Sequence, residues 1–193
     1  KELAQKMPTA VVIASENKEA AKKAQELFTT SYFRVYTHDD IEGVELGGAV
    51  KNVIAIATGI SDGLGFGYNT RAALITRGLA EIARLGVKLG ANPLTFSGLA
   101  GMGDLVLTCT GELSRNRTVG FKIGHGMTLR EATEGMRMVA EGIATAKAAY
   151  ELSRKVGVDM PIAEHVYRIL YEGLPAKNAV ISLMSRESKK ELE

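Results

Sequence analysis

A lysine within an apolar stretch is the first residue whose setting could support chemistry. Lys51 lies in LGGAVKNVIAIA, residues 46–57, where the only other polar side chain is that of Asn52. Lysine is rarely buried without a partner, and burial lowers the pKa of a lysine toward the range useful for proton transfer. Two interpretations stay open. Lys51 is a buried proton donor and acceptor, or it reaches the surface along a polar stripe shared with Asn52.

Two consecutive glycines, Gly47 and Gly48, precede this lysine in the same predicted helix. Each glycine destabilises a helix by roughly 1 kcal/mol relative to alanine, so a compensating contact is expected. Close approach of another backbone or of a ligand would provide it, and a tight helix crossing would explain the pair equally well.

A cluster of cations without an acid occupies residues 114–122, where Arg115, Arg117 and Lys122 occur. Ser114 is a good N-cap, which places Arg115 and Asn116 in the first turn of a helix. Cations there oppose the helix dipole, and a bound phosphate would explain them, because free N–H groups, an arginine fork and an amide all bind phosphate oxygens. A solvated basic loop is the alternative.

Asp104 follows Gly103 and precedes an apolar run. It could hold a lysine from elsewhere in the chain, or it could be an ordinary turn or capping residue. Cys109 is the only cysteine, and we expect it to be a small buried side chain. With three scattered histidines, one cysteine excludes a disulfide framework and a Cys/His zinc site, so no metal site is predicted.

The elements that must position these residues change in character along the chain. Residues 8–14 and 32–37 are predicted strands, with a helix over 18–28 between them, as in a βαβ-type unit of a larger sheet. From residue 43 onward we expect only helices. A break is predicted at residues 139–142, and Thr128 with Glu131 forms a capping box. The main predicted helices cover 44–60, 69–90, 143–155, 161–173 and 176–184.

Composition limits the class of protein. Hydrophobic residues make up 46% and charged residues 24% of the 193 residues, which is typical of a soluble globular protein. The formal net charge of +2 gives no general attraction to nucleic acid. We see no apolar run that approaches the roughly 18 residues of a membrane span. The first residue is Lys1 rather than Met, so we expect the sequence to begin inside a longer protein.

Three stretches in this order resemble one enzyme family over residues 8–184. They are GGAVKNVIA from Gly47, GLGFGYNTRAA from Gly63, and the segment from Gly103-Asp104-Leu105 to Ser114-Arg-Asn-Arg117. Together they are similar to bacterial NAD(P)-dependent glycerol-3-phosphate dehydrogenases. The resemblance implies a mainly α fold: residues 43–193 form an all-helical substrate domain like the C-terminal domain of 6-phosphogluconate dehydrogenase. Residues 1–42 are the remnant of a Rossmann-type domain whose G-x-G-x-x-G fingerprint is absent.

The resemblance also implies roles for individual residues. Lys51 is the proton donor and acceptor, with Asp104 beside it as the second catalytic residue. The substrate-binding residues are Lys51, Asp104, Thr108, Ser114, Arg115 and Asn116, and the cofactor edge is formed by Arg115, Val139 and Glu141.

The implied reaction is the reversible reduction of dihydroxyacetone phosphate to sn-glycerol 3-phosphate with NADH or NADPH, in the cytoplasm, for glycerophospholipid synthesis. Two alternatives stay open. By itself the chain is a non-catalytic helical module that binds substrate or forms a homodimer. Otherwise it belongs to a related dehydrogenase of another small phosphorylated substrate.

Overall fold

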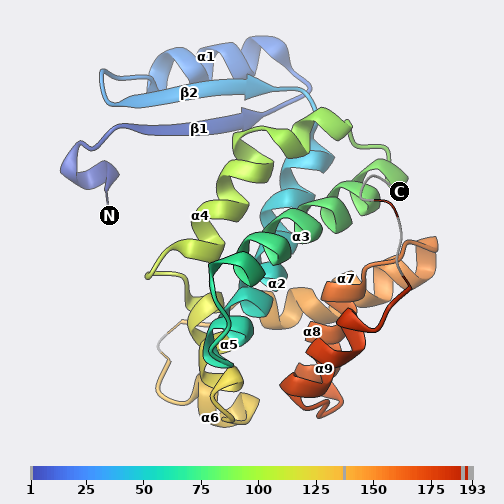
Figure 1. Ribbon diagram of the computed structural model, residues 1–193. Helices are drawn as coiled ribbons and strands as arrows, with labels where there is room; N and C mark the ends of the chain where they lie inside the picture. Colours follow the sequence, from blue (N-terminus) through green and yellow to red (C-terminus); the bar gives the residue numbers. More distant parts are fainter. Residues whose placement is uncertain (1, 137, 188–189, 191–193) are drawn as a thin grey trace.

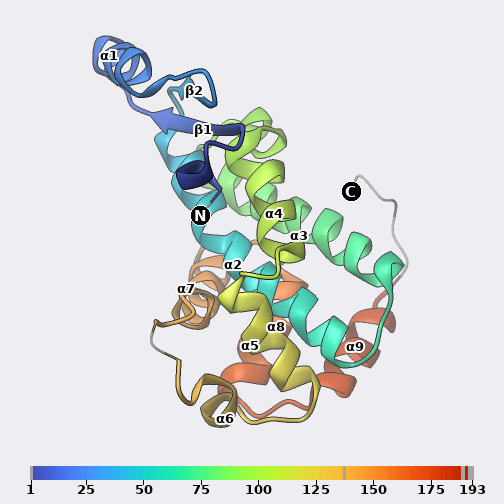
Figure 2. The ribbon, with the colours of Figure 1, turned by 90° about the vertical axis from the view of Figure 1, so that its left-hand side faces the viewer.

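The computed structural model describes residues 2–136, 138–187 and 190. After a 3-10 turn, η1 (Leu3–Gln5), the chain forms the parallel strands β1 (Thr9–Ala14) and β2 (Phe33–His38), joined by helix α1 (Lys18–Phe28). The predicted strand–helix–strand unit is therefore confirmed. Figure 1 and Figure 2 show α1 on one side of the two strands and the helical body on the other.

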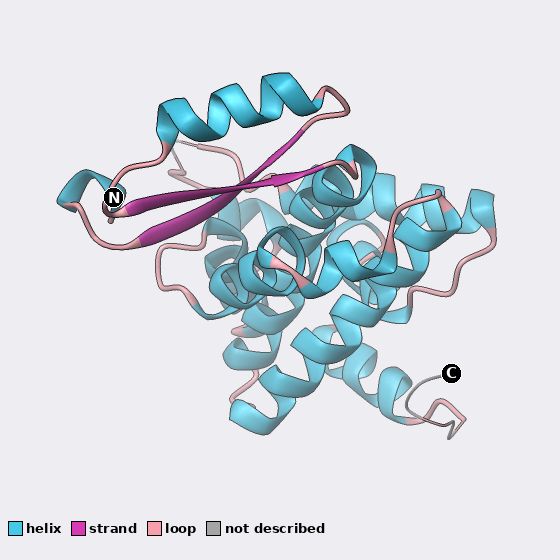
Figure 3. Ribbon diagram, turned by 90° about the horizontal axis from the view of Figure 1, so that it is seen from above, coloured by secondary structure: helices cyan, strands magenta, loops and turns pink. Residues whose placement is uncertain are grey.

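Helices make up the rest of the described chain, as predicted, and Figure 3 shows how little strand the molecule contains. Helix α2 begins at Ile41 rather than at residue 44, because the Asp40 side chain caps it by accepting from the Gly43 N–H at 2.9 Å. The predicted capping box at Thr128 and the predicted helix start at Pro161 are confirmed.

The helical elements after β2 are α2 (Ile41–Gly63), α3 (Tyr68–Lys88), the 3-10 helix η2 (Pro93–Ser97), the π-helical turn η3 (Leu99–Gly103), α4 (Asp104–Thr110), α5 (Arg115–Gly124), α6 (Leu129–Thr133), α7 (Gly142–Val156), α8 (Pro161–Tyr171) and α9 (Ala176–Met184).

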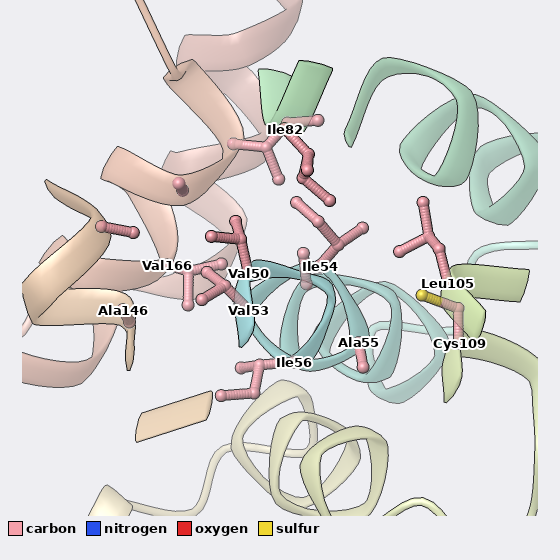
Figure 4. Packing of buried hydrophobic residues seen from close by; sticks show 14 of the residues in the cluster. Val50, Val53, Ile54, Ala55, Ile56, Ile82, Leu105, Cys109, Ala146 and Val166 are labelled. Atoms are coloured by element: carbon pink, nitrogen blue, oxygen red, sulfur yellow. The ribbon is translucent and has the colours of Figure 1, made fainter. Parts of the chain in front are cut away.

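Helix α2 is the centre of the fold. Its consecutive residues Val53, Ile54, Ala55 and Ile56 are all fully buried, so the helix is covered on every side rather than on one face. Figure 4 shows these side chains pointing in different directions, with Ile82, Leu105, Cys109, Ala146 and Val166 from other elements around them. By length and composition α2 could also cross a membrane, but 67% of its most apolar window is buried inside the fold. That burial is typical of a core helix.

Glycines let α2 and α5 approach until their backbones touch. A Cβ at Gly59 would overlap the carbonyl oxygen of Arg117, and one at Gly120 would overlap that of Ile56. The same holds one turn later, where Gly63 faces Phe121 and Gly124. No larger residue fits at these positions without moving a backbone. This α2–α5 crossing therefore fixes where the first turn of α5 lies along α2.

Candidate active site

Lys51 and Asp104 form the charged pair of the site. Lys51 lies on α2, and its Nζ donates to Oδ2 of Asp104, the first residue of α4. Their side chains are 18% and 35% exposed, so the pair is partly shielded but still open to a ligand. Lys51 is thus a partnered, half-buried lysine. Of the two interpretations of Asp104, the one in which it holds a lysine from elsewhere in the chain is confirmed. Asp104 is not an ordinary turn residue, because η3 leads directly into α4 and Asp104 is the first residue of that helix.

Close backbone contact brings η3 and α4 to α2. A Cβ on Gly47 would lie 3.1 Å from the carbonyl oxygen of Ala100, so the predicted close approach is confirmed there. At Gly48 a Cβ would meet no heavy atom of the described residues within 4 Å, so no backbone approaches it there, and approach of a ligand stays a prediction. One glycine of the pair therefore serves packing, and the other faces open space.

Thr108 lies one turn after Asp104 on α4 and restrains it. The Thr108 hydroxyl donates to the Asp104 carbonyl oxygen at 2.6 Å and lies 3.3 Å from its Oδ1. Because Oδ2 faces Lys51, the two carboxylate oxygens have different neighbours. Thr108 thus contacts the charged pair through Asp104.

Asn52 does not share a polar stripe with Lys51, and that interpretation is wrong. Asn52 is only 8% exposed, because its Oδ1 accepts from Nδ2 of Asn116 at 2.9 Å inside the fold. Oδ1 of Asn116 in turn accepts from the Gly142 N–H at 2.9 Å. Sequence reasoning missed this chain of hydrogen bonds across α2, α5 and α7. Its one signal was a second polar residue beside Lys51 in an apolar stretch.

The first turn of α5 has the predicted form. Ser114 is the N-cap, and its hydroxyl accepts from the Arg117 N–H at 3.3 Å. Asn116 is buried, whereas Arg115 is exposed and donates from Nη1 to the Val139 carbonyl oxygen at 3.2 Å. The structure therefore brings Arg115 and Val139 together, although they are far apart in sequence.

Helix α7 begins where the pattern break was predicted. A Cβ on Gly142 would lie 2.6 Å from the Asn52 carbonyl oxygen, so the start of α7 touches α2. Just before it, Val139 and Glu141 are exposed. The N-terminal ends of α5 and α7 therefore converge beside Asn52, and helix N-terminal ends favour anions.

Two acidic residues and one cysteine are further buried groups near α2 and α3. Sequence reasoning missed Asp62, which pairs with Arg71 and Arg117, and Glu81, which is 1% exposed between α3 and α8. Cys109 is fully buried, and burial raises the pKa of its thiol to about 12. The prediction that it is a small buried side chain is confirmed, and it is a poor nucleophile.

The sequence is similar to a known family and to several known proteins. Residues 40–181 match the sequence model of a family described as NAD-dependent glycerol-3-phosphate dehydrogenase C-terminus. Glycerol-3-phosphate dehydrogenases [NAD(P)+] of Geobacter metallireducens and Geobacter sulfurreducens are 66% and 63% identical over 191 residues. These alignments include 99% of this chain but 57% of each relative, so the chain spans little more than half the length of those proteins.

Solved structures give the same result for the fold. The chain is similar to the crystal structure of glycerol-3-phosphate dehydrogenase from Coxiella burnetii, with a TM-score of 0.92, 48% identity, and coverage of 96% of this chain and 57% of that one. It is also similar to the enzyme of Saccharomyces cerevisiae, with a TM-score of 0.84, 31% identity, and coverage of 96% and 56%. The mainly helical fold is thus confirmed. Because the family match includes well over half of its residues, the chain belongs to the NAD-dependent glycerol-3-phosphate dehydrogenase family and carries the C-terminal part of that fold.

Proposed function

We propose that this chain forms the substrate-binding part of an enzyme that interconverts dihydroxyacetone phosphate and sn-glycerol 3-phosphate with NADH or NADPH. The single observation that carries the proposal is the half-buried ion pair between Lys51 on α2 and Asp104 on α4. The basic first turn of α5 is bound to the same helix α2, through the hydrogen bond between Asn116 and Asn52. The names of the relatives support the same reaction. We place the enzyme in the cytoplasm, where its product serves glycerophospholipid synthesis.

Lys51 performs the proton transfer. Its ammonium has three N–H donors, of which Asp104 takes one, so the others are available to a substrate oxygen. In the reducing direction, negative charge develops on the carbonyl oxygen as the carbon gains hydride. Lys51 stabilises that charge and then donates a proton to it. In the opposite direction Lys51 begins as the neutral amine, accepts the proton of the hydroxyl group and becomes the ammonium. Asp104 and Thr108 hold the ammonium in a fixed direction.

The first turn of α5 binds the substrate phosphate. Ser114 and Asn116 offer neutral polar groups, and Arg115 offers a guanidinium fork to the phosphate oxygens. The partial positive charge at the helix end adds to this attraction. Since the phosphate does not react, its binding energy serves to position the carbonyl group near Lys51.

The chain fits only one edge of the cofactor. The segment between β1 and α1 contains Ser15, Glu16 and Asn17, without the glycines that admit a dinucleotide pyrophosphate. Arg115, Val139 and Glu141 are exposed together and would lie against the nicotinamide end. When bound, the nicotinamide supplies or accepts the hydride. We assign residues 1–42 to the nucleotide domain and residues 43–193 to the substrate domain.

Lys51→Ala in the full-length dehydrogenase tests the proposed role of this lysine. We expect kcat for glycerol 3-phosphate oxidation to fall about 10²- to 10⁴-fold, because the proton acceptor is lost. NADH affinity, measured by fluorescence titration, should not change. Lys155→Ala, an exposed lysine at the end of α7, is the matched control and should keep full activity. Near-normal turnover of Lys51→Ala would exclude Lys51 as the proton donor.

By itself, the chain should be a non-catalytic helical module or homodimer that binds substrate. It should show no turnover, because the dinucleotide fingerprint is absent from it. Calorimetric titration with glycerol 3-phosphate should show binding, while titration with NADH should show none. Clear NADH binding would contradict this. Faster turnover of another small phosphorylated alcohol by the full-length enzyme would instead point to a related dehydrogenase.

A further inference from the structure

Asp62 is an almost buried carboxylate to which the proposed reaction gives no direct role. It lies on α2, and its side chain is 6% exposed. Oδ1 accepts from Nε and Nη2 of Arg71 on α3, at 3.0 and 2.7 Å. Oδ2 accepts from Nε of Arg117 on α5 at 2.9 Å and lies 2.8 Å from its Nη2. Each oxygen therefore holds one guanidinium, and each guanidinium comes from a different helix.

The two arginines in the first turn of α5 have different surroundings. Arg117 is paired with Asp62, and its side chain is 22% exposed. Arg115 is exposed, and across residues 2–136, 138–187 and 190 no carboxylate lies within ion-pair distance of it. Cations in a first turn oppose the helix dipole. Asp62 compensates one of them, so the charge of the other remains for an anionic ligand.

Asp62 also limits how α5 can rotate. Asn116 and Arg117 are neighbours on α5, yet they bind Asn52 and Asp62, which are ten residues apart on α2. At 1.5 Å per residue this separation is about 15 Å along the helix. The glycines of the α2–α5 crossing limit rotation of α5 about its axis, because rotation would bring larger residues to positions where not even a Cβ fits. The two distant polar attachment points complete this restraint at the first turn of α5.

We propose that Asp62 is a positioning residue for phosphate binding. Acting through Arg117, it fixes the rotation of the first turn of α5 so that Arg115 and the free N–H groups of that turn face the substrate phosphate. Asp62 touches neither substrate nor cofactor. This inference rests on the proposed function, because it takes the first turn of α5 as the phosphate site. Arg71 binds the other carboxylate oxygen of Asp62, Oδ1, and so links α3 to α2. This link does not involve α5.

The two partners of Asp62 give a matched pair of variants in the full-length enzyme. Arg117→Gln and Arg71→Gln each remove one guanidinium from the same carboxylate, so both should lower Tm. Only Arg117→Gln should raise KM for glycerol 3-phosphate, by about tenfold, since small misplacement of a binding group is costly. The inhibition constant of inorganic phosphate should rise in parallel. In both variants kcat should stay within about threefold of wild type.

Two further variants keep the inference falsifiable if Arg117→Gln does not fold. Asp62→Asn keeps the shape of the side chain and should raise the same KM, while Asp62→Glu restores the charge and should recover most of the loss. An equal rise in KM for Arg117→Gln and Arg71→Gln, or no rise in any of these variants, would overturn the positioning role. A wild-type enzyme that does not oxidise glycerol 3-phosphate would instead overturn the proposed function, before any variant is compared.

Discussion

The two sides of α2 are packed in opposite ways. Toward α5, four glycines allow backbone to lie against backbone, with no space for even one added carbon atom. Toward α3, α8 and α9, side chains leave a cavity of about 420 Å³, whose lining includes Ile60, Ser61 and Ala73. The proposed phosphate-binding part of the candidate site lies at the α5 side, where Asn52 meets Asn116. Tight packing is thus used where polar groups must be held in place, and loose packing where none of the proposed chemistry occurs.

Adding a methyl group at the α2–α5 crossing should have the largest effect. In Gly120→Ala the new Cβ overlaps the Ile56 carbonyl oxygen and lies 2.9 Å from the Ile60 nitrogen, so the helices must separate. We expect the free energy of unfolding in urea to fall by about 4 kcal/mol. The matched control is Gly48→Ala on α2, where a Cβ meets nothing within 4 Å. There the gain in helix propensity should stabilise the fold by roughly 0.5–1 kcal/mol. Equal effects of the two variants would show that the crossing is not close-packed.

The next effect concerns pH and the cavity side of α2. Glu81 lines the cavity and accepts from the N–H groups of Ile162 and Ala163 at 2.7 and 3.1 Å, at the start of α8. Burial raises the pKa of its carboxyl group from 4.5 to about 7, although these hydrogen bonds oppose the shift. Between pH 4.5 and 7 the folded state therefore holds a proton that the unfolded state has released.

The sign follows from this difference in bound protons. The contribution of Glu81 to stability is complete below pH 4.5 and is lost as the pH rises through 7. The loss amounts to about 3 kcal/mol at most. Glu81→Gln should remove that slope, which urea unfolding of both proteins at pH 5, 6, 7 and 8 would measure. A parallel pH dependence in the two proteins would contradict a protonated Glu81.

The smallest effect is expected from filling the cavity. Ala73 is exposed on α3 and lines the cavity, so a leucine there can extend into open space. We expect Ala73→Leu to change the free energy of unfolding by no more than about 0.5 kcal/mol. The two variants should be measured together. Ala73→Leu adds a larger group beside the cavity, whereas Gly120→Ala adds a single methyl group at the close-packed α2–α5 crossing. A loss as large as that of Gly120→Ala would remove the contrast between the two sides.

The local signals in the sequence predicted the fold well. Ser114 and Thr128 mark helix starts through side-chain caps, and Pro161 marks one through its fixed backbone angle; the structure confirms all three. The break at residues 139–142 was also visible, because apolar spacing stops there. These features depend on neighbouring residues only, and a linear pattern contains that information.

Features that depend on distant contacts were not predicted. Gly59 and Gly120 are ordinary helix-weakening residues until the opposite backbone is in place. Glu81 lies among the charged residues of α3, and the docking of α8 above it explains its burial. The burial of Asn52 was not predicted, because its partner, Asn116, is 64 residues away. Of the site, residue types and capping were predictable, whereas hydrogen-bond partners were not.

The α2–α5 crossing also has a consequence for synthesis of the chain. Gly59 contacts Arg117, and Ile56 contacts Gly120, so α2 meets this partner only after about sixty further residues have been made. At ribosomal rates of about 5–20 residues per second, that delay is roughly 3–12 seconds. During it, a helix apolar enough to resemble a membrane span has one side uncovered. The nascent chain should therefore engage chaperones most strongly between the emergence of α2 and that of α5.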